Sequence, residues 1–459
     1  MKIENILKKK NFCSDSRILK KNDIFFDFLS SSKKINPYIK NIIDKSPSLI
    51  ISPRPLNYKN VLLRKNVKKF YFSSIKKKYQ NITKNIYAVT GTNGKTSVAN
   101  FFYQLNILNK IPCANIGTLG YFYNNKLKKN NLTTPDNLDL FKFLDFIKRK
   151  GINKVILEAS SHGLAQGRLD GLKFKGVIFT NFSQDHLDYH KSMQSYFDAK
   201  LILFKKNLLK NSNIICDDNL AQKLFKKKIS KKKFNFILQN KKKIPFKIVC
   251  SKPANTKTKI KINYKNQIYN FNLNIVGDFQ IKNLYQAIVL SLLSGLDKNK
   301  ILKALPKIRP IKGRLNIIKN RHKIICIDYA HTPDGLEKVI KTLKNHFKKN
   351  VNIVFGCGGN RDIGKRFKMG QVVKKYCKQI IITDDNPRNE NPKQITKQIF
   401  QSVRRGQIIQ NRKAAIKTGI KITKKNEILL IAGKGHENYQ IFKNRKIHFS
   451  DFEEVSNNL

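Results

Sequence analysis

The sequence lacks any apolar run long enough to cross a membrane. Although 40% of its 459 residues are hydrophobic, no stretch of roughly 18 uncharged apolar residues occurs, and a spanning helix needs about 20. The first ten residues hold no apolar segment of signal-peptide length either. The sequence therefore predicts no membrane span, and its length leaves apolar material for the cores of about three domains.

Closely spaced cysteine pairs are also absent. The seven cysteines are scattered, and no two have the C-x-x-C spacing. This pattern argues against both a disulfide framework and a structural zinc site. It is typical of the reducing cytoplasm, where we expect this protein to be located.

Acidic residues are scarce: 29 Asp and Glu stand against 93 Lys and Arg, a net charge of +64. Such an excess by itself suggests a nucleic-acid partner. The lysines, however, are spread along the whole chain together with Asn, Ile and Phe, whose codons are rich in A and T. We interpret the charge as base composition and expect no nucleic-acid partner, with a nucleic-acid-binding NTPase as the alternative from another class.

What the sequence does contain is a phosphate-binding pattern. A short apolar run turns through Gly91 and Gly94 into Lys95, Thr96 and a helix-periodic segment over residues 98–108. Glycines let backbone N–H groups surround phosphate oxygens at the positive end of a helix. The lysine adds a mobile charge, and the threonine hydroxyl can ligate a phosphate-bound Mg²⁺. The G-x-x-G-K-T spacing is shorter than usual, so an ordinary tight turn before a helix is the alternative.

Strand-like and helix-like segments alternate along the chain, which predicts an α/β fold with mostly parallel sheets. We expect three domains: a small α/β module over 1–85 that ends in a lysine-rich connector (76–84), a phosphate-loop domain over 86–307 with an antiparallel flap at 246–273, and a second doubly wound sheet over 308–459. Expected strands are 23–29, 48–52, 154–158, 176–180, 213–216, 323–328, 351–355, 379–383 and 427–432, and expected helices are 39–45, 140–147, 195–203 and 278–293.

Polar residues follow the predicted central strands, where open α/β sheets bind ligands. Glu158 is a candidate Mg²⁺ ligand, with a solvated loop acid as the alternative. His186 follows the next strand and could complete a metal shell or orient a ligand. With His162 and His190 it could instead form a zinc site, although the ligand spacing gives no support. On periodicity alone, Lys200 is an exposed helical lysine.

A second polar group follows the predicted C-terminal strands. Two arginines, a carboxylate and an amide there suit a zwitterionic amino acid, because guanidinium groups pair with carboxylates. Generic loop polarity is the alternative. The expected pocket is lined by Arg361, Asn386, Arg388, Gly433 and Glu437.

Together these motifs resemble the Mur ligase family over essentially the whole chain. The short glycine spacing is the form that this family uses, and the motif that ends in Arg388 resembles that of members adding meso-diaminopimelate. The matching motifs, in family order, are Gly91–Thr96, Thr133–Thr134, Glu158–Gly163, Asp185–His190, Gly313–Arg314, Asp328–Asp334 and Asp385–Arg388.

The resemblance implies an ATP-dependent amide ligase of peptidoglycan precursor synthesis. ATP would phosphorylate the free D-Glu carboxylate of UDP-MurNAc-L-Ala-D-Glu, and the amine of meso-diaminopimelate would attack the acyl phosphate. A sister ligase that adds lysine or another amino acid is the nearest alternative. The three domains would bind the UDP substrate, ATP and the amino acid in that order, and we expect a monomer.

The resemblance also implies residue roles. Lys95, Lys200, Glu158 and His186 would be catalytic, with Thr96 on a first Mg²⁺, Glu158 and His186 on a second, and Lys200 carbamylated to N6-carboxylysine as an anionic metal bridge. The ATP residues would be Gly91, Thr92, Asn93, Gly94, Lys95, Thr96, Ser97, Asn283, Arg314 and Asp328. The UDP-substrate residues would be Ser16, Thr133, Thr134, Ser160, Gln166 and Arg168, and the diaminopimelate residues Arg361, Asp385, Asn386, Pro387, Arg388, Gly433 and Glu437.

Two positions depart from the family pattern. Gln280 stands where the family usually has Asn, and Asn316 stands where an acid commonly follows the Gly-Arg pair. The adenine contact near Asn283 is the feature that the first departure affects.

Overall fold

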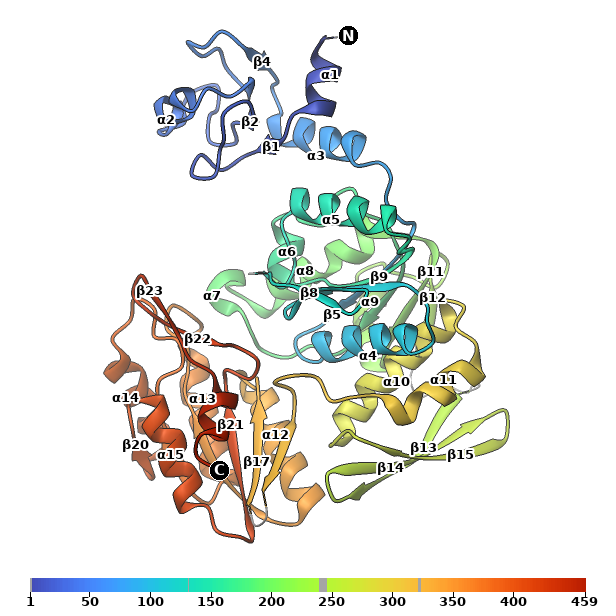
Figure 1. Ribbon diagram of the computed structural model, residues 1–459, viewed down its shortest axis with the longest axis vertical. Coiled ribbons are helices and arrows are strands. Elements are labelled where there is room, and N and C mark those ends of the chain that lie inside the picture. The colour runs from blue at the N-terminus through green and yellow to red at the C-terminus, as the bar shows by residue number, and fades with distance from the viewer. Residues whose placement is uncertain (1, 131, 239–245, 321–322) are drawn as a thin grey trace.

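The computed structural model describes residues 2–130, 132–238, 246–320 and 323–459, arranged as three successive α/β parts. In Figure 1 the N-terminal part lies at the top, the central part packs beneath it, and the C-terminal part lies beside the central part, away from the N-terminus. Among the described ranges, no helix is long and apolar enough to cross a membrane.

The N-terminal part is a four-stranded parallel sheet in the order β1 (Phe12–Cys13), β2 (Ile24–Phe26), β3 (Leu49–Ser52) and β4 (Val61–Leu63). Its helices are α1 (Lys2–Lys9), α2 (Ile39–Asp44) and α3 (Val67–Lys78). The two predicted strands and the predicted helix are confirmed.

The predicted connector over 76–84 is wrong in its first part, because α3 continues to Lys78. Val67, Tyr71 and Ile75 are buried on one face of this helix, at the i, i+4, i+8 spacing of an apolar stripe. The terminal lysines are favourable near the negative helix end. The same stripe packs in one cluster with residues of α5 (Asn137–Arg149) and joins the N-terminal part to the central part.

The central part has eight strands: β5 (Asn85–Thr90), β6 (Cys113–Gly117), β7 (Gly120–Tyr123), β8 (Lys126–Lys128), β9 (Lys154–Glu158), β10 (Phe174–Phe179), β11 (Leu208–Cys216) and β12 (Asn235–Leu238). Their order is β12-β11-β10-β5-β9-β6-β7-β8. The strands from β12 to β6 are parallel, and β7 and β8 add an antiparallel edge.

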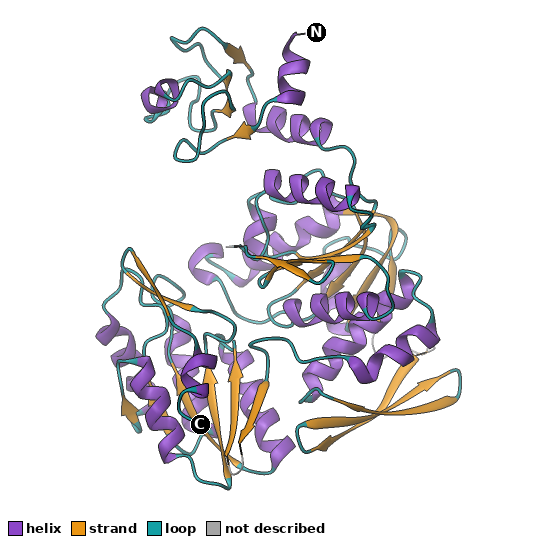
Figure 2. Cartoon of the chain, in the orientation of Figure 1, coloured by secondary structure: helices purple, strands orange, loops and turns teal. Residues whose placement is uncertain are grey.

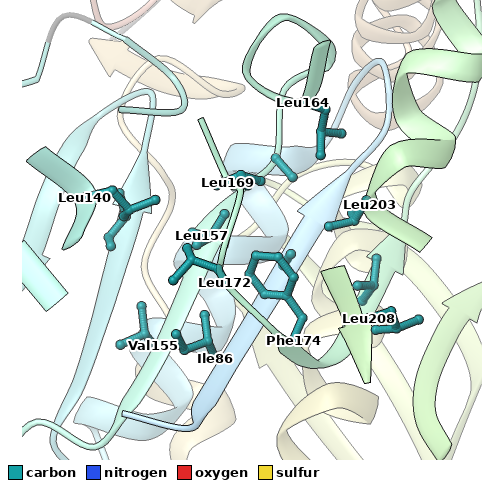
Figure 3. Close-up of a cluster of buried hydrophobic side chains, with 14 of the residues drawn as sticks. Ile86, Leu140, Val155, Leu157, Leu164, Leu169, Leu172, Phe174, Leu203 and Leu208 are labelled. Atoms are coloured by element: carbon teal, nitrogen blue, oxygen red, sulfur yellow. The ribbon is translucent and has the colours of Figure 1, made fainter. Parts of the chain in front are cut away.

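Side chains alternate between the two faces of this sheet, and each face has its own core. Ala88 and Leu157 belong to one buried cluster, whereas their neighbours Val89 and Ile156 belong to the other, as the two-residue period of a strand requires. Figure 3 shows part of the first cluster. Besides α5, the helices are α4 (Lys95–Ile107), α6 (Ser161–Ala165), α7 (Leu187–His190), α8 (Met193–Ile202), α9 (Asp218–Lys226), α10 (Asp278–Leu293) and α11 (Lys298–Ala304).

The predicted antiparallel flap is confirmed as a three-stranded sheet of β13 (Phe246–Ala254), β14 (Lys257–Tyr264) and β15 (Gln267–Leu273). Figure 2 shows it as a separate layer beside the helices of the central part.

The C-terminal part is a six-stranded sheet in the order β16-β17-β21-β18-β19-β20, parallel except for β16. The strands are β16 (Asn316–Asn320), β17 (Lys323–Asp328), β18 (Asn350–Phe355), β19 (Ile380–Ile382), β20 (Gln407–Ile408) and β21 (Glu427–Ala432), followed by a hairpin of β22 (Tyr439–Phe442) and β23 (Arg445–His448). The helices are α12 (Pro333–Phe347), α13 (Gly364–Tyr376), α14 (Pro392–Val403), α15 (Arg412–Ile422) and α16 (Asp451–Ser456). The second doubly wound sheet is confirmed.

The central and C-terminal parts meet where their strands end. The Asn93 side chain donates to the Asp334 carboxylate at 3.0 Å, and the Lys365 ammonium lies 3.5 Å from the Asp185 carboxylate. These contacts bring the start of α12 against the phosphate loop and the start of α13 against the segment that follows β10.

Candidate active site

The phosphate loop connects β5 to α4, as the sequence predicts. Gly91 and Gly94 have φ angles of 142° and 87°. A Cβ on Gly91 would lie 2.0 Å from Thr180 Oγ1, and one on Gly94 would lie 2.7 Å from Asn283 Oδ1. Both positions therefore require glycine. The Lys95 ammonium folds back over the loop and donates to the carbonyls of Gly91 and Thr92, both at 2.8 Å.

Glu158, at the end of β9, is 1% exposed, so its interpretation as a solvated loop acid is wrong. Its carboxylate accepts from Thr96 Oγ1 at 3.0 Å, from the Thr118 N–H at 2.9 Å and from Thr118 Oγ1 at 3.1 Å. A Cβ at Gly117 would lie 2.1 Å from Glu158 Oε1. Thr118 was missed by sequence reasoning, although it directly follows a strand.

His186 adopts a left-handed backbone conformation, with φ of 56°. Asp185 supports it twice, because its carboxylate accepts from the His186 N–H at 2.9 Å and lies 3.3 Å from Nε2. Burial lowers the pKa of His186 to about 2, so the ring is neutral, as a metal-ligating imidazole must be. The same carboxylate also lies 3.9 Å from Nε2 of His331 and 3.5 Å from Nζ of Lys365. Sequence reasoning had assigned Asp185 no role of its own.

Lys200 is 1% exposed, so the periodicity-based expectation of a surface lysine is wrong. Buried residues lie on several faces of helix α8, for example Tyr196 and Leu201. A helix that is buried on several faces has no clear amphipathic pattern in its sequence. The Lys200 ammonium donates to the Gly91 carbonyl at 3.0 Å and lies 4.5 Å from the centre of the Tyr196 ring. Burial, and then the nearby Lys95, lower its pKa well below the usual value.

The rings of His162, His186 and His190 pack against one another. The His162 ring lies edge-on to those of His186 and His190, with centroids 4.7 Å and 5.4 Å away, and it also packs on Tyr189. Within the ranges that the structure describes, no group of three or more His, Cys, Asp or Glu side chains is arranged to hold a metal ion. The geometry gives the zinc alternative no support.

A cavity of about 720 Å³ lies between the phosphate loop, α10 and α12. It brings together most of the residues predicted for ATP and for catalysis, together with two of those predicted for the UDP substrate. The predicted residues that line it are Thr92, Asn93, Gly94, Lys95, Thr96, Ser97, Thr133, Glu158, Ser160, His186, Lys200, Asn283, Arg314 and Asp328.

The residues expected to contact ATP outside the phosphate loop are each held by neighbouring groups. Gln280 Oε1 accepts from the Asn283 amide at 3.1 Å. Both Asp328 oxygens accept backbone N–H groups at 2.7 Å, from Leu315 and Ala330, and burial raises the pKa of this carboxyl. Arg314 reaches across to Thr96 Oγ1 at 3.4 Å. Asn316, the second departure from the family pattern, accepts from the Gly313 N–H.

The residues expected on the UDP-substrate side divide into two groups. Thr134 Oγ1 donates to the Glu158 carbonyl at 2.7 Å, and Arg168 donates to the Thr134 carbonyl at 2.9 Å, which keeps these two beside the cavity. Gln166 donates to the Tyr189 hydroxyl at 3.3 Å. Ser16 belongs to the N-terminal part, where its carbonyl accepts from Lys45, and it does not line the cavity.

The residues expected to bind the amino acid form a second cluster, outside the cavity lining. The Asn386 amide donates to Glu437 Oε2 at 2.9 Å, and Lys434 contacts both residues at 3.1 Å and 2.9 Å. Arg388 has a φ of 54° and donates to the Gly359 carbonyl at 2.8 Å. Lys434 was missed by sequence reasoning.

Three glycines allow this cluster to pack tightly. A Cβ on Gly433 would lie 2.7 Å from Asp385 Oδ2, one on Gly358 would lie 2.8 Å from the Arg388 guanidinium, and one on Gly359 would lie 1.9 Å from the Pro387 carbonyl oxygen. Burial lowers the pKa of Arg388, and the nearby positive charge of Arg361 lowers it further.

Comparisons with known proteins give one consistent result. The family model described as "Mur ligase middle domain" matches residues 89–291, and "Mur ligase, glutamate ligase domain" matches residues 313–435. A protein of Rickettsia montanensis named UDP-N-acetylmuramoyl-L-alanyl-D-glutamate--2,6-diaminopimelate ligase is 40% identical over 98% of this chain and 95% of its own length. A protein of the same name from Wigglesworthia glossinidia brevipalpis is 35% identical over 95% of this chain and 92% of its own length.

Solved structures agree with the sequences. A structure of a ligase with that name is similar at a TM-score of 0.66 and 31% identity, covering 98% of this chain and 94% of the other. The MurF ligase of Thermotoga maritima in complex with ADP matches at a TM-score of 0.66, covering 94% of this chain and 95% of the other, but at 14% identity it shows the fold alone. The chain belongs to the Mur ligase family.

Proposed function

We propose that this chain is an ATP-dependent amide ligase that adds meso-diaminopimelate to UDP-MurNAc-L-Ala-D-Glu, the reaction of the tripeptide synthetases (MurE). The observation that carries the proposal is the 40% identity, over 98% of the chain, to a ligase of that name. The phosphate loop and the separate cluster around Arg388 agree with it, because they provide sites of different chemistry for the two substrates.

The residues fit the magnesium that such a reaction needs. The described contacts of the Glu158 carboxylate come from hydroxyl and amide groups, without an ion pair, so its charge is available to a cation. Thr96 would supply a hydroxyl oxygen to a first Mg²⁺, and Glu158 and His186 would supply a carboxylate oxygen and a neutral ring nitrogen to a second. Oxygen is the ligand that Mg²⁺ prefers. Bound there, magnesium would neutralise the charge of the phosphate oxygens.

The chain's own residues then position the reactants. The loop N–H groups and Lys95 would hold the ATP phosphates, which requires Lys95 to exchange the carbonyls of Gly91 and Thr92 for phosphate oxygens. Ser160 and Thr133, beside Glu158, would hold the D-Glu carboxylate near the γ-phosphate. Phosphoryl transfer to that carboxylate gives an acyl phosphate, and attack by the diaminopimelate amine forms the amide and releases phosphate.

Lys200 would act as N6-carboxylysine. Carbamylation requires a neutral amine, and burial of Lys200 together with the charge of Lys95 favours the neutral form. A carbamate would convert this buried amine into an anion beside the phosphate loop, where it would serve as a metal ligand. The Tyr196 ring beside Lys200 would help to exclude water from it.

The choice of amino acid would depend on Arg388. Diaminopimelate brings a second carboxylate that lysine lacks, and a guanidinium binds it through two parallel hydrogen bonds. Since ATP and the UDP-linked substrate are cytoplasmic metabolites, we place the protein in the cytoplasm, and we expect a monomer because both substrate sites lie within one chain.

An amino-acid panel tests the proposal. The purified chain, with UDP-MurNAc-L-Ala-D-Glu, ATP and Mg²⁺, should release phosphate with meso-diaminopimelate and much less with lysine. Equal rates with both amino acids would remove the selectivity. Phosphate release stimulated by DNA or RNA, but not by the UDP-linked substrate, would instead favour a nucleic-acid-dependent NTPase.

A further inference from the structure

Tyr329 lies between the two clusters of the active site. It directly follows β17, and its ring lies under the Arg314 guanidinium, with the central carbon 4.4 Å from the ring centre. Its backbone N–H donates to the Gly313 carbonyl at 2.9 Å, and Arg314 donates to the same carbonyl at 3.1 Å. The sequence motifs gave this tyrosine no role.

The other side of Tyr329 packs on the loop Gly433–Glu437, which carries the proposed amino-acid ligand Glu437. A Cβ on Gly435 would lie 2.7 Å from the Tyr329 Cβ, and one on Gly313 would lie 2.3 Å from the backbone nitrogen of His436. The His436 ring is 5.0 Å from the Tyr329 ring. Three loops are thus in backbone contact around this one side chain.

The position of Arg314 explains why such support matters. Its guanidinium ends 3.4 Å from Thr96 Oγ1 in the phosphate loop, although Arg314 belongs to the other sheet. Besides its hydrogen bonds to Thr96 and the Gly313 carbonyl, it contacts the Tyr329 ring, and it is near enough to the Asp328 carboxylate to lower the pKa of that group against the larger effect of burial. A free arginine samples many rotamers, and ordering it on nucleotide binding has an entropic cost that a stacked ring reduces.

We propose that Tyr329 is a positioning residue, whose ring fixes the Arg314 guanidinium against the phosphate loop and couples it to the amino-acid loop Gly433–Glu437. The inference rests on the proposed use of ATP, but not on which amino acid is added. Tyr329 would act through the face of its aromatic ring, so we expect its hydroxyl to be dispensable.

The test compares Tyr329→Phe, which keeps the face, with Tyr329→Leu, which removes it. A cation–π contact of this kind corresponds to about 3- to 30-fold in a binding constant. We expect Tyr329→Leu to weaken binding of a non-hydrolysable ATP analogue by that factor in calorimetric titration, and Tyr329→Phe to change it by less than about twofold. The matched control is Phe70→Leu, which removes a similar contact, with Arg64 at 4.7 Å, in the N-terminal part.

A double-variant cycle shows whether Tyr329 acts through Arg314. In an Arg314→Ala background, Tyr329→Leu should cause little further loss, because the group that it positions is gone. Additive losses, an unchanged affinity in Tyr329→Leu, or equal losses in Tyr329→Phe and Tyr329→Leu would each overturn the inference. The wild-type chain reports separately on the proposed function, since failure to bind the analogue at all would overturn the use of ATP itself.

Discussion

The two clusters of the active site differ in what their polar groups already bind. Around the phosphate loop, Glu158 and the two buried amines of Lys95 and Lys200 have hydroxyl, amide or carbonyl partners, and the charges have not paired with one another. In the amino-acid cluster, Glu437 is already paired with Lys434 and Asn386. These three groups of the first cluster therefore have only uncharged partners to exchange, whereas Glu437 in the second cluster must give up an ion pair for its substrate.

This difference predicts which substitutions matter most. Removing the charge of Glu158, Lys95 or Lys200 should remove an interaction with the metal or the phosphates that their uncharged neighbours cannot replace. Removing one from the second leaves the neighbouring groups partly satisfied by each other, so the loss should appear mainly in the binding of one substrate.

The largest effect is expected for Lys200→Ala. A carbamate that carries negative charge to the metal is worth several kcal/mol, so phosphate release should fall about 1,000-fold or more. Formate or acetate should restore part of the activity by supplying a carboxylate in the vacated space. The control is Lys205→Ala on the exposed surface just beyond α8, which should retain full activity. Full activity in Lys200→Ala would mean that Lys200 contributes only to packing.

Glu158→Gln should be the next most severe. The amide keeps the shape of the carboxylate but loses its charge, and one lost electrostatic contact to the reacting groups costs about 100- to 1,000-fold in kcat. Steady-state phosphate release measures it, with circular dichroism to show that the fold is retained. Glu337→Gln, in a partly exposed pair with Lys341, is the matched control, and equal rates for both variants would contradict the assignment.

Arg388→Ala tests the second cluster. Because a charge-assisted hydrogen bond contributes about 1.5–3 kcal/mol, the KM for diaminopimelate should rise about 10- to 100-fold while the KM for ATP changes little. Arg445→Ala, on the exposed strand β23, should leave both constants unchanged. A parallel rise in both constants would mean that Arg388 acts on the fold rather than on this substrate.

The sequence predicted which residues form each cluster better than it predicted their burial. Strand ends and glycine spacing located the phosphate loop, Glu158 and His186, because strand order brings such residues to one edge of a parallel sheet. Burial was harder to predict: Lys200 on α8 was misinterpreted, since lysine is so frequent in this chain that its presence says little about exposure. The same frequency made the last turn of α3, up to Lys78, resemble a polar connector.

Contacts between sheets were beyond any local pattern. Lys365 with Asp185 and Arg314 with Thr96 join residues from different parts of the chain. No periodicity encodes which loop of one sheet meets which loop of another. The motifs predicted the residues of each cluster, whereas the contacts between the two sheets could be seen only in the structure.

The smallest expected effect comes from Asp384, which lies beside the amino-acid cluster and should affect stability. Burial raises the pKa of this carboxyl to about 6, above the ordinary value of about 3.9. The folded state therefore favours the protonated form, and Asp384 lowers stability increasingly as pH rises from about 4 to 6.

Asp384→Asn should consequently stabilise the chain by about 1–2 kcal/mol at pH 7, after allowance for solvent screening, with the gain shrinking as pH falls toward 4. Asn can still accept the hydrogen bond from Gln410. Urea unfolding at pH 7, 5.5 and 4 measures the effect, and Asp44→Asn on an exposed helix end is the control. A gain that does not depend on pH would mean that the substitution acts through packing, because only a titrating carboxylate links this position to proton concentration.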